Sequence, residues 1–385
     1  MPAQATLNHA AQVLAGITSD LRADTALRFY FDSHRYLSPA ERRQISQAIF
    51  SYYRWLEWLE PKAAPQRRIE QATELQARFA ADVKAVKAEA LVARAVPAWV
   101  WEELDFAGAA DPAAAKAAYV RQLQREPTLW LRARPGRAAE LAQVLAGCVP
   151  AEKVPDALAY TGTVDLYKSA PFQAGAFEIQ DLASQLVGHA AAPAPGETWW
   201  DACAGEGGKL LHLADLMRNR GLIWASDRHT GRLEALKRRA ARAKIFNYRA
   251  AAWDGGPRLP TKTRFDGILV DAPCSGVGTW QRNPQARWTT SPADVQELKA
   301  TQLNLLNTVA GSLKPNGRLI YSVCTLTRSE TTGVADLFAT AHPELEPWPL
   351  PIAAPGATDP SRVTLWPHEH NANGMFLAGW KRKGS

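Results

Sequence analysis

The chain has 385 residues, a length that favours two or three domains over a single core. Charged residues make up 22% and hydrophobic residues 46%, as in an ordinary globular protein, and the formal net charge of +7 permits a polyanionic partner without proving one. The first residues lack a basic flank followed by an apolar run, and no uncharged apolar stretch is long enough to span a bilayer. We therefore expect a cytoplasmic protein with no secretory signal and no membrane contact.

The chain contains only four cysteines, which are Cys148, Cys203, Cys274 and Cys324. None of them is spaced as C-x-x-C, so we expect no zinc or other metal site. A disulfide framework is not expected either in a chain this long and this poor in cysteine.

Residues 1–92 have the pattern of a helical domain. Ser38, Pro39 and Glu41 form an N-cap, a proline at the first helical position and a capping-box glutamate, and apolar residues then recur three and four apart through Trp55. Two interpretations remain open: a purely structural bundle, or a helical module that binds RNA or a partner. Residues 93–126 are also predicted to be helical, as a connector between domains.

Residues 127–192 are predicted to form a small α+β unit. Pro127–Arg134 alternates like a strand, a helical stretch runs from about Ala138 to Leu145, and Thr163–Tyr167 has the pattern of a second short strand.

Residues 193–385 repeat the order strand, loop, helix. We expect strands at 198–202, 221–227, 265–271 and 318–322, and helices at 208–219, at 230–244 and from 292 onward. Such alternation predicts a Rossmann-like, doubly wound parallel sheet that binds its ligands at the carboxyl ends of its strands.

A glycine loop, Asp201–Lys209, connects the first of these strands to its helix. Its G-x-G-G spacing differs from the G-x-G-x-x-G of nicotinamide dinucleotide sites, which favours S-adenosylmethionine as the cofactor. Asp227 ends the next strand and is placed to accept hydrogen bonds from ribose hydroxyls, and Asp254 follows the presumed third strand, where adenine would lie. A strand-end aspartate is about as often a helix cap, so each residue alone is a weak signal.

Two cysteines follow two different strands of this predicted sheet. Cys274 lies three residues after Asp271, and Cys324 follows the strand that ends near Ser322. A thiolate that adds to carbon 6 of a pyrimidine makes carbon 5 nucleophilic, and the enzyme thiol must leave after methyl transfer, so two thiols suit this chemistry. Cysteine is more often a small buried hydrophobe, an interpretation that we keep for Cys148 and Cys203.

The chain resembles the RsmB/Sun (Fmu, NOL-type) family of RNA 5-methylcytosine methyltransferases. The resemblance spans roughly residues 170–385, with a weaker likeness over the helical N-terminus, and it is strongest over Asp201–Lys209, Asp271–Trp288 and Tyr321–Glu330. It implies a NusB-like domain for residues 1–92 and an RRM-like subdomain for 127–192. The chain departs from the family where Val323 replaces the usual threonine and where Gly205-Glu206 replaces alanine-proline.

By this resemblance, Cys324 is the nucleophile, Cys274 assists release of the product, and Asp271 holds ring nitrogen 3 and the amino group of cytosine. Lys209, Arg282 and Arg287 are implied to be RNA-binding residues, the two arginines by facing phosphate or by ordering the cysteine loop. The predicted cofactor-binding residues are Cys203, Ala204, Gly205, Glu206, Gly207, Gly208, Lys209, Asp227, Arg232, Asp254 and Asp271.

These observations favour a monomeric RNA cytosine-5 methyltransferase, with ribosomal RNA as the favoured substrate and transfer RNA as the alternative. Its target base would have to leave its stack, which favours loops or unpaired bases. A catalytically silent ribosome-assembly factor of the same fold is a second hypothesis, weakened by the presence of Asp271, Cys274 and Cys324. Methylation of a protein or a small molecule would not need two cysteines.

Overall fold

The computed structural model describes residues 3–18 and 21–384, which divide into two compact units. One unit holds the chain up to Pro127 together with Thr279–Ser291, and the other holds Thr128–Gly278 and the chain from Pro292 onward. The predicted connector therefore packs with the N-terminal helices, and residues 279–291, which were predicted within the methyltransferase domain, pack there as well. The finer division into four domains stays a prediction.

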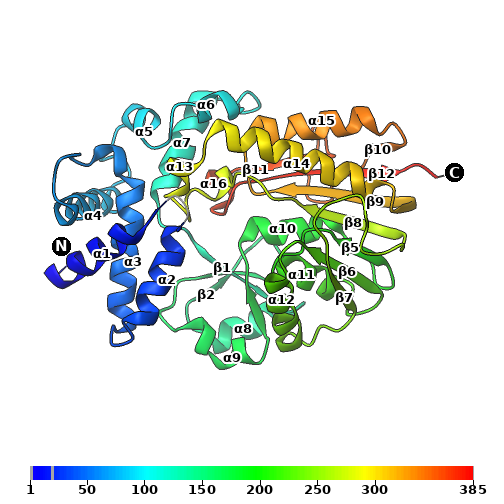
Figure 1. Cartoon of the computed structure of the whole chain (residues 1–385), viewed down its shortest axis with the longest axis horizontal. Coiled ribbons are helices and arrows are strands. Elements are labelled where there is room, and N and C mark those ends of the chain that lie inside the picture. The colour runs from blue at the N-terminus through cyan, green and yellow to red at the C-terminus, as the bar shows by residue number, and fades with distance from the viewer. Residues whose placement is uncertain (1–2, 19–20, 385) are drawn as a thin grey trace. The chain divides into compact units, whose positions relative to one another are not determined.

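The first unit is built from helices in its described residues (Figure 1). They are α1 (Gln4–Gly16), α2 (Ala23–Ser33), α3 (Pro39–Arg54), α4 (Pro65–Ala81), α5 (Ala88–Arg94), α6 (Val100–Glu103), α7 (Pro112–Gln124) and α13 (Ala286–Thr289). The predicted capping box begins α3: the Glu41 N–H donates to Ser38 Oγ, and the Ser38 N–H donates to the Glu41 carboxylate. Reciprocal bonds of this kind satisfy two backbone donors that a helix start leaves free.

Arg287 lies inside this helical unit rather than on its surface. Its side chain is fully buried, and its guanidinium group donates to the carbonyl oxygens of Ala95, Leu123 and Trp280 and to Gln124 Oε1. Burial lowers the pKa of this guanidinium to about 9. A phosphate contact for Arg287 is therefore wrong, because the five donors of the side chain are directed into the protein. Ordering of the cysteine loop, the other predicted role, stays a prediction, and the observed contacts of Arg287 fix segment 279–291 to the helical unit.

The second unit contains a four-stranded antiparallel sheet, in the order β2-β3-β1-β4. Its elements are β1 (Leu129–Ala133), α8 (Ala138–Val144), β2 (Cys148–Pro150), β3 (Ala157–Tyr160), α9 (Ala170–Gln173) and β4 (Phe177–Ile179). The predicted strand at Thr163–Tyr167 is wrong. The Asp165 side chain accepts a hydrogen bond from the Tyr167 N–H and begins a 3₁₀ turn at Leu166–Lys168, while the strand lies earlier, at β3.

The larger sheet has the order β10-β12-β9-β8-β5-β6-β7, and β11 pairs with β12. Its strands are β5 (Thr198–Asp201), β6 (Leu222–Asp227), β7 (Tyr248–Ala252), β8 (Phe265–Asp271), β9 (Leu313–Val323), β10 (Leu345–Pro347), β11 (Arg362–Leu365) and β12 (Met375–Arg382). The five strands from β9 to β7 run parallel, and β10, β11 and β12 add antiparallel pairs. This confirms the predicted Rossmann-like class. β6 and β7 are added on one side of β5, whereas β8 and β9 are added on its other side. The topological switch point therefore lies between β5 and β8.

Helices cover both faces of the larger sheet (Figure 1). They are α10 (Leu182–Ala191), α11 (Gly208–Leu216) and α12 (Thr230–Arg242) on one face, and α14 (Pro292–Ala310) and α15 (Thr332–Ala341) on the other; α16 (Pro367–His370) precedes β12. Trp199 and Trp200 are neighbours on β5 and are both fully buried, one in each of the two cores. Successive strand residues point to opposite faces, so this pair anchors both layers at the central strand.

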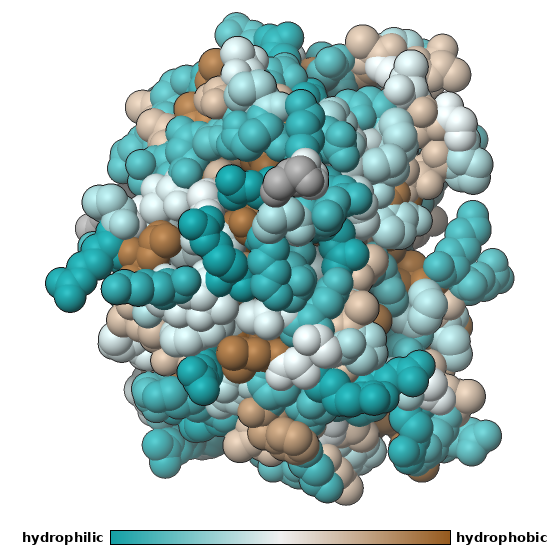
Figure 2. Space-filling view, turned by 90° about the vertical axis from the view of Figure 1, so that its right-hand side faces the viewer, coloured by the Kyte–Doolittle hydropathy of each residue, from teal (hydrophilic) through white to brown (hydrophobic). Residues whose placement is uncertain are grey.

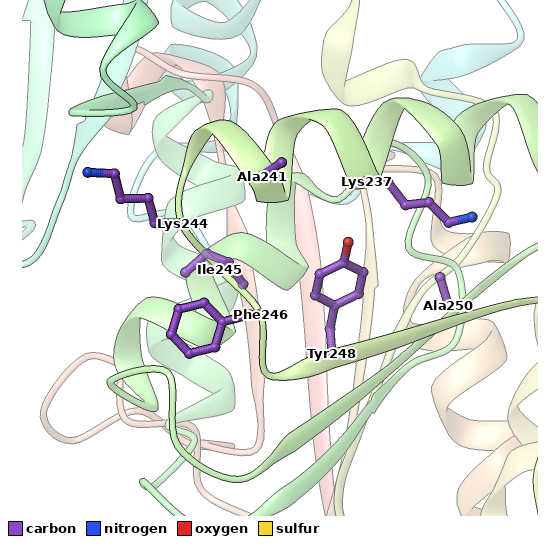
Figure 3. Close-up of a pocket in the computed structure, with 7 residues that line it drawn as sticks. All are labelled: Lys237, Ala241, Lys244, Ile245, Phe246, Tyr248 and Ala250. Atoms are coloured by element: carbon purple, nitrogen blue, oxygen red, sulfur yellow. The ribbon is translucent and has the colours of Figure 1, made fainter.

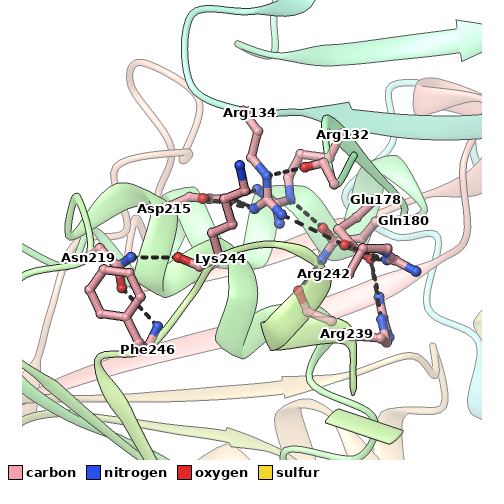
Figure 4. Close-up of polar contacts among 12 residues, drawn as sticks. Arg132, Arg134, Glu178, Gln180, Asp215, Asn219, Arg239, Arg242, Lys244 and Phe246 are labelled. Carbon is pink, nitrogen blue, oxygen red and sulfur yellow. Dashed lines mark hydrogen bonds and ion pairs between the residues drawn. The ribbon is translucent and has the colours of Figure 1, made fainter. Parts of the chain in front are cut away.

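Ion pairs connect the smaller sheet to the helices of the larger one (Figure 4). Asp215 of α11 accepts hydrogen bonds from Arg132 and Arg134, and Glu178 of β4 accepts from Arg239 and Arg242 of α12. Burial raises the pKa of Glu178, but the two arginines outweigh it and leave that pKa below its ordinary value. Arg132, Arg134, Arg239 and Arg242 therefore connect the smaller sheet to the helices that cover the larger one.

Figure 2 views the side on which β12 ends, where Lys381 pairs with Arg318 in the first half of β9. Hydrophilic side chains cover most of this face, and hydrophobic ones are scattered in small groups. The carboxyl ends of the parallel strands lie at the other end of the sheet. Among the described residues, no helix is both long and apolar enough to cross a membrane.

Candidate active site

Four parallel strands place acidic residues and cysteines at their carboxyl ends, on one side of the larger sheet. β5, β6 and β8 end at Asp201, Asp227 and Asp271, and Cys324 directly follows β9. Because β8 and β5 flank the switch point, the loops after these strands diverge and leave room for a ligand between them.

The glycine loop is fastened to the end of β6 by its backbone. The Ala204 N–H donates to the Ser226 carbonyl oxygen over 2.8 Å, and the Gly205 N–H donates to Asp227 Oδ2 over 3.0 Å. Gly207 has a φ of +84°, and a Cβ atom there would lie 2.7 Å from Leu236 Cγ, so the turn into α11 requires glycine. On Gly205, by contrast, a Cβ atom would meet no described atom within 4 Å, so the backbone faces open space.

Asp227 is buried, and its Oδ1 atom also accepts a hydrogen bond from the His229 N–H over 2.8 Å. Arg232 lies 3.9 Å from Asp227 Oδ2 and lines a pocket together with Arg228, His229, Thr230 and Gly231. Asp254 is exposed, and its Oδ1 atom accepts from the Gly256 N–H in a tight turn. Roles for Asp227, Arg232 and Asp254 in cofactor binding stay predictions.

Asp201 was not among the predicted site residues, yet its carboxylate is the least satisfied in the site. The residue is 1% exposed, and neither carboxylate oxygen has a hydrogen-bond partner among the described residues. Burial, followed by the charges of Asp271 and Asp227, raises its pKa to about 7, against the opposing effect of Lys209. A buried carboxylate without partners is costly, so this group fits a ligand that brings a positive charge or donors to the loop.

Lys209 and Asp271 form an ion pair at the carboxyl end of β8. Lys209 Nζ donates to Asp271 Oδ2 over 2.6 Å, and Ser322 Oγ donates to Asp271 Oδ1 over 2.8 Å. Burial lowers the pKa of Lys209, but the charges of Asp271 and Cys324 outweigh it, so the pKa lies above its ordinary value. Lys209 therefore stays a cation, which stabilises a negative charge on Asp271 or on Cys324.

Cys274 and Cys324, although 50 positions apart, meet with their Sγ atoms 3.4 Å apart. Both are half-buried. The hydrogen bond to Cys324, then burial, then the charges of Cys324 and Glu330 raise the pKa of Cys274 well above its ordinary value. The two thiols are therefore in direct contact, and the raised pKa favours the protonated form of Cys274.

The remaining cysteines have environments that do not favour a thiolate. Cys148 lies on β2 of the smaller sheet, where burial raises its pKa. Cys203 begins the glycine loop, and burial followed by the charges of Asp201, Asp271 and Asp227 raises its pKa.

Arg282 is exposed within segment 279–291, and its contact with RNA stays a prediction.

A separate pocket lies between α12 and β7, and none of its lining residues is a predicted site residue (Figure 3). It is lined by Lys237, Ala241, Lys244, Ile245, Phe246, Tyr248 and Ala250. Among the described residues, no group of three or more His, Cys, Asp or Glu side chains is placed to hold a metal ion.

Comparisons with known proteins identify the family to which the chain is similar. Residues 189–381 match the family model described as 16S rRNA methyltransferase RsmB/F. The chain is 37% identical over 220 residues to a probable ribosomal RNA small subunit methyltransferase B of Bacillus subtilis, covering 55% of this chain and 49% of the relative. It is 32% identical over 302 residues to the protein of the same description in Synechocystis, covering 74% of this chain and 66% of the relative.

A solved structure of a methyltransferase homolog from Pyrococcus horikoshii is similar as well, with a TM-score of 0.62 and 26% identity over 70% of this chain and 91% of that one. The chain spans about half the length of the Bacillus relative and 66% of the Synechocystis one.

Proposed function

The chain belongs to the RsmB/F family of 16S rRNA methyltransferases, and from this premise we propose that it methylates carbon 5 of a cytosine in RNA. The observation that carries the proposal is the pair of thiols 3.4 Å apart, beside the Lys209–Asp271 ion pair. Methyl transfer to a nucleophilic atom of protein or RNA needs no enzyme thiol, whereas carbon 5 of cytosine becomes nucleophilic only after an addition to carbon 6.

S-adenosylmethionine would supply the methyl group as a sulfonium. The Asp201 carboxylate, which lacks partners, would accept hydrogen bonds from the ammonium group of its methionine part, and Asp227 would accept from the ribose hydroxyls. The backbone at Gly205 faces open space and allows close approach to the glycine loop. The remaining predicted cofactor residues lie in the glycine loop or at the start of α11, and three others, Arg232, Asp254 and Asp271, lie outside it.

The reaction would start at Cys324. Its thiolate adds to carbon 6 of cytosine, while Asp271 holds the amino group and the protonated ring nitrogen 3 of the adduct. The electron pair on carbon 5 would then form the new bond to the methyl carbon while the methyl–sulfonium bond breaks and its electron pair stays on sulfur, which leaves as a neutral thioether. A base next takes the proton from carbon 5, and the carbon–sulfur bond to Cys324 breaks, which restores the ring and the thiolate. Cys274 lies close enough to Cys324 to assist this release.

Ribosomal RNA is the favoured substrate, because the matched family is described as one of 16S rRNA methyltransferases. Transfer RNA is the alternative substrate, and a silent assembly factor is the alternative function. We propose that the protein acts in the cytoplasm as a monomer, with Lys209 and Arg282 near the RNA.

Bisulfite sequencing of total RNA tests the substrate. We expect one or a few cytosines of small-subunit ribosomal RNA to be protected from conversion in the parent strain and to be converted in a strain lacking this protein. Protection that disappears from transfer RNA instead would support the alternative substrate. An unchanged pattern in both RNA classes would contradict the enzymatic proposal.

Asp201→Asn tests the cofactor site through two properties that change in opposite directions. Because the folded pKa of about 7 lies above the ordinary value of about 4, the native state holds the extra proton, and stability falls as pH rises through this window. The variant should therefore melt at a higher temperature than the wild type at pH 8, with a smaller difference at pH 5. Its affinity for S-adenosylmethionine should fall roughly 10- to 100-fold by calorimetry, as expected for loss of a charged hydrogen bond. Unchanged affinity would refute the assignment.

A further inference from the structure

Glu330 is a buried carboxylate that the proposed reaction does not use. It ends the 3₁₀ turn Arg328–Glu330, six residues after Cys324, and is fully buried. Its Oε1 atom accepts from the Ser275 N–H and from Gln302 Nε2, each over 2.9 Å. Its Oε2 atom accepts from the hydroxyls of Ser275, Thr325 and Thr327, the last two over 3.1 and 2.7 Å.

These bonds join the two cysteine loops. Ser275 directly follows Cys274, and Thr325 directly follows Cys324. Their hydroxyl groups also contact each other over 2.9 Å, and the Gly278 N–H donates to the Cys324 carbonyl oxygen over 3.1 Å. The two sulfur atoms therefore belong to one hydrogen-bonded frame, with Glu330 at its centre.

The charge of Glu330 is not needed for this frame alone. All five hydrogen bonds that its oxygens accept in the described part of the chain come from neutral groups, so no cation offsets the cost of burying a charge there. A glutamine could accept the Oε1 bonds, and hydroxyl groups can rotate to accept from its amide. The negative charge does act on Cys274, whose pKa it helps to raise.

We propose that Glu330 is a positioning residue that ties the Cys274 and Cys324 loops together and keeps the Cys274 thiol in contact with Cys324. The inference rests on the proposed function. In the free enzyme, a Cys274 S–H in this frame would donate to Cys324 Sγ, which leaves Cys324 as the nucleophile. After addition, the same frame keeps Cys274 beside the carbon–sulfur bond that has to break. Glu330 itself does not have to touch RNA for this to hold.

The test compares Glu330→Gln with the wild type on cytosine-containing RNA with S-adenosylmethionine present. We expect the variant to accumulate a covalent protein–RNA adduct, with kcat lowered about tenfold or more and KM for RNA little changed. The pH dependence of adduct release should move to lower pH, because removal of the charge removes one cause of the raised Cys274 pKa. A purely structural role would lower stability without moving this pH profile.

Glu197→Gln is the matched control. Glu197 precedes β5 and accepts hydrogen bonds from the Ala194 N–H, Trp199 Nε1 and Arg318, but it lies at the amino end of the strand. This control should keep the wild-type pH profile. If Glu330→Gln does not fold, Ser275→Ala removes one side of the frame and should give the same adduct in smaller amount.

The outcomes separate the two proposals. A wild-type kcat and pH profile in Glu330→Gln would overturn the role of Glu330. Absence of 5-methylcytosine and of any adduct with the wild-type protein would overturn the proposed function instead.

Discussion

Cys324→Ala should lose cytosine methylation by at least about a thousandfold, because no other thiol can form the bond to carbon 6 that activates carbon 5. Cys324 directly follows β9, with its sulfur beside Cys274 and close enough to Lys209 for their charges to interact. The measurement is the initial rate of methyl transfer from labelled S-adenosylmethionine to RNA. Binding of the cofactor, measured by calorimetry, should change little, since the glycine loop is intact.

Cys148→Ala is the control for this loss. Cys148 lies on β2 of the smaller sheet and has no place in the proposed reaction, so this variant should methylate RNA at the wild-type rate. Retained activity in Cys324→Ala would show that another group makes the addition, and it would remove the nucleophile assignment.

Cys274→Ala should have the opposite consequence: the covalent adduct forms but leaves slowly. The addition needs only the Cys324 thiolate, whereas release breaks a bond to the Cys324 sulfur, which lies 3.4 Å from the Cys274 sulfur. We expect turnover to fall by about two orders of magnitude or more, as for loss of a positioned proton-transfer group. A protein–RNA species that survives denaturing electrophoresis should appear in its place.

The double variant Cys274→Ala/Cys324→Ala should form no such species, which ties the adduct to Cys324. Normal turnover of Cys274→Ala, with no adduct, would remove the release role and leave Cys274 as a structural neighbour.

Those parts of the fold that depend on local pattern could be predicted from the sequence. The buried strand Phe265–Asp271 was predicted at the same limits as β8, because a strand covered on both faces has a nearly continuous run of apolar residues. The helix starts at Gly208 and Thr230 were also predicted correctly. β9 begins at Leu313 rather than Arg318, because the chain bends at Asn316, with a φ of +63°, without leaving the sheet.

The errors and omissions share a different cause, which is contact between residues distant in the chain. The resemblance to the family implies a phosphate contact for Arg287, and only the fold shows the carbonyl oxygens that surround its guanidinium group. Asp201 was passed over as the end of a strand, and nothing local shows that its oxygens lack partners. Glu330 stood within the resemblance without a role, because its bonds to the Cys274 loop span 55 positions.

The identity of the residue bound to RNA in the Cys274→Ala adduct tests the central claim most directly. Protease and nuclease digestion of this adduct, followed by mass spectrometry, should find a methylated cytidine fragment on the peptide that contains Cys324. A fragment on a peptide without Cys324, or a label on RNA with no linked peptide, would contradict attack by Cys324 on carbon 6 of cytosine.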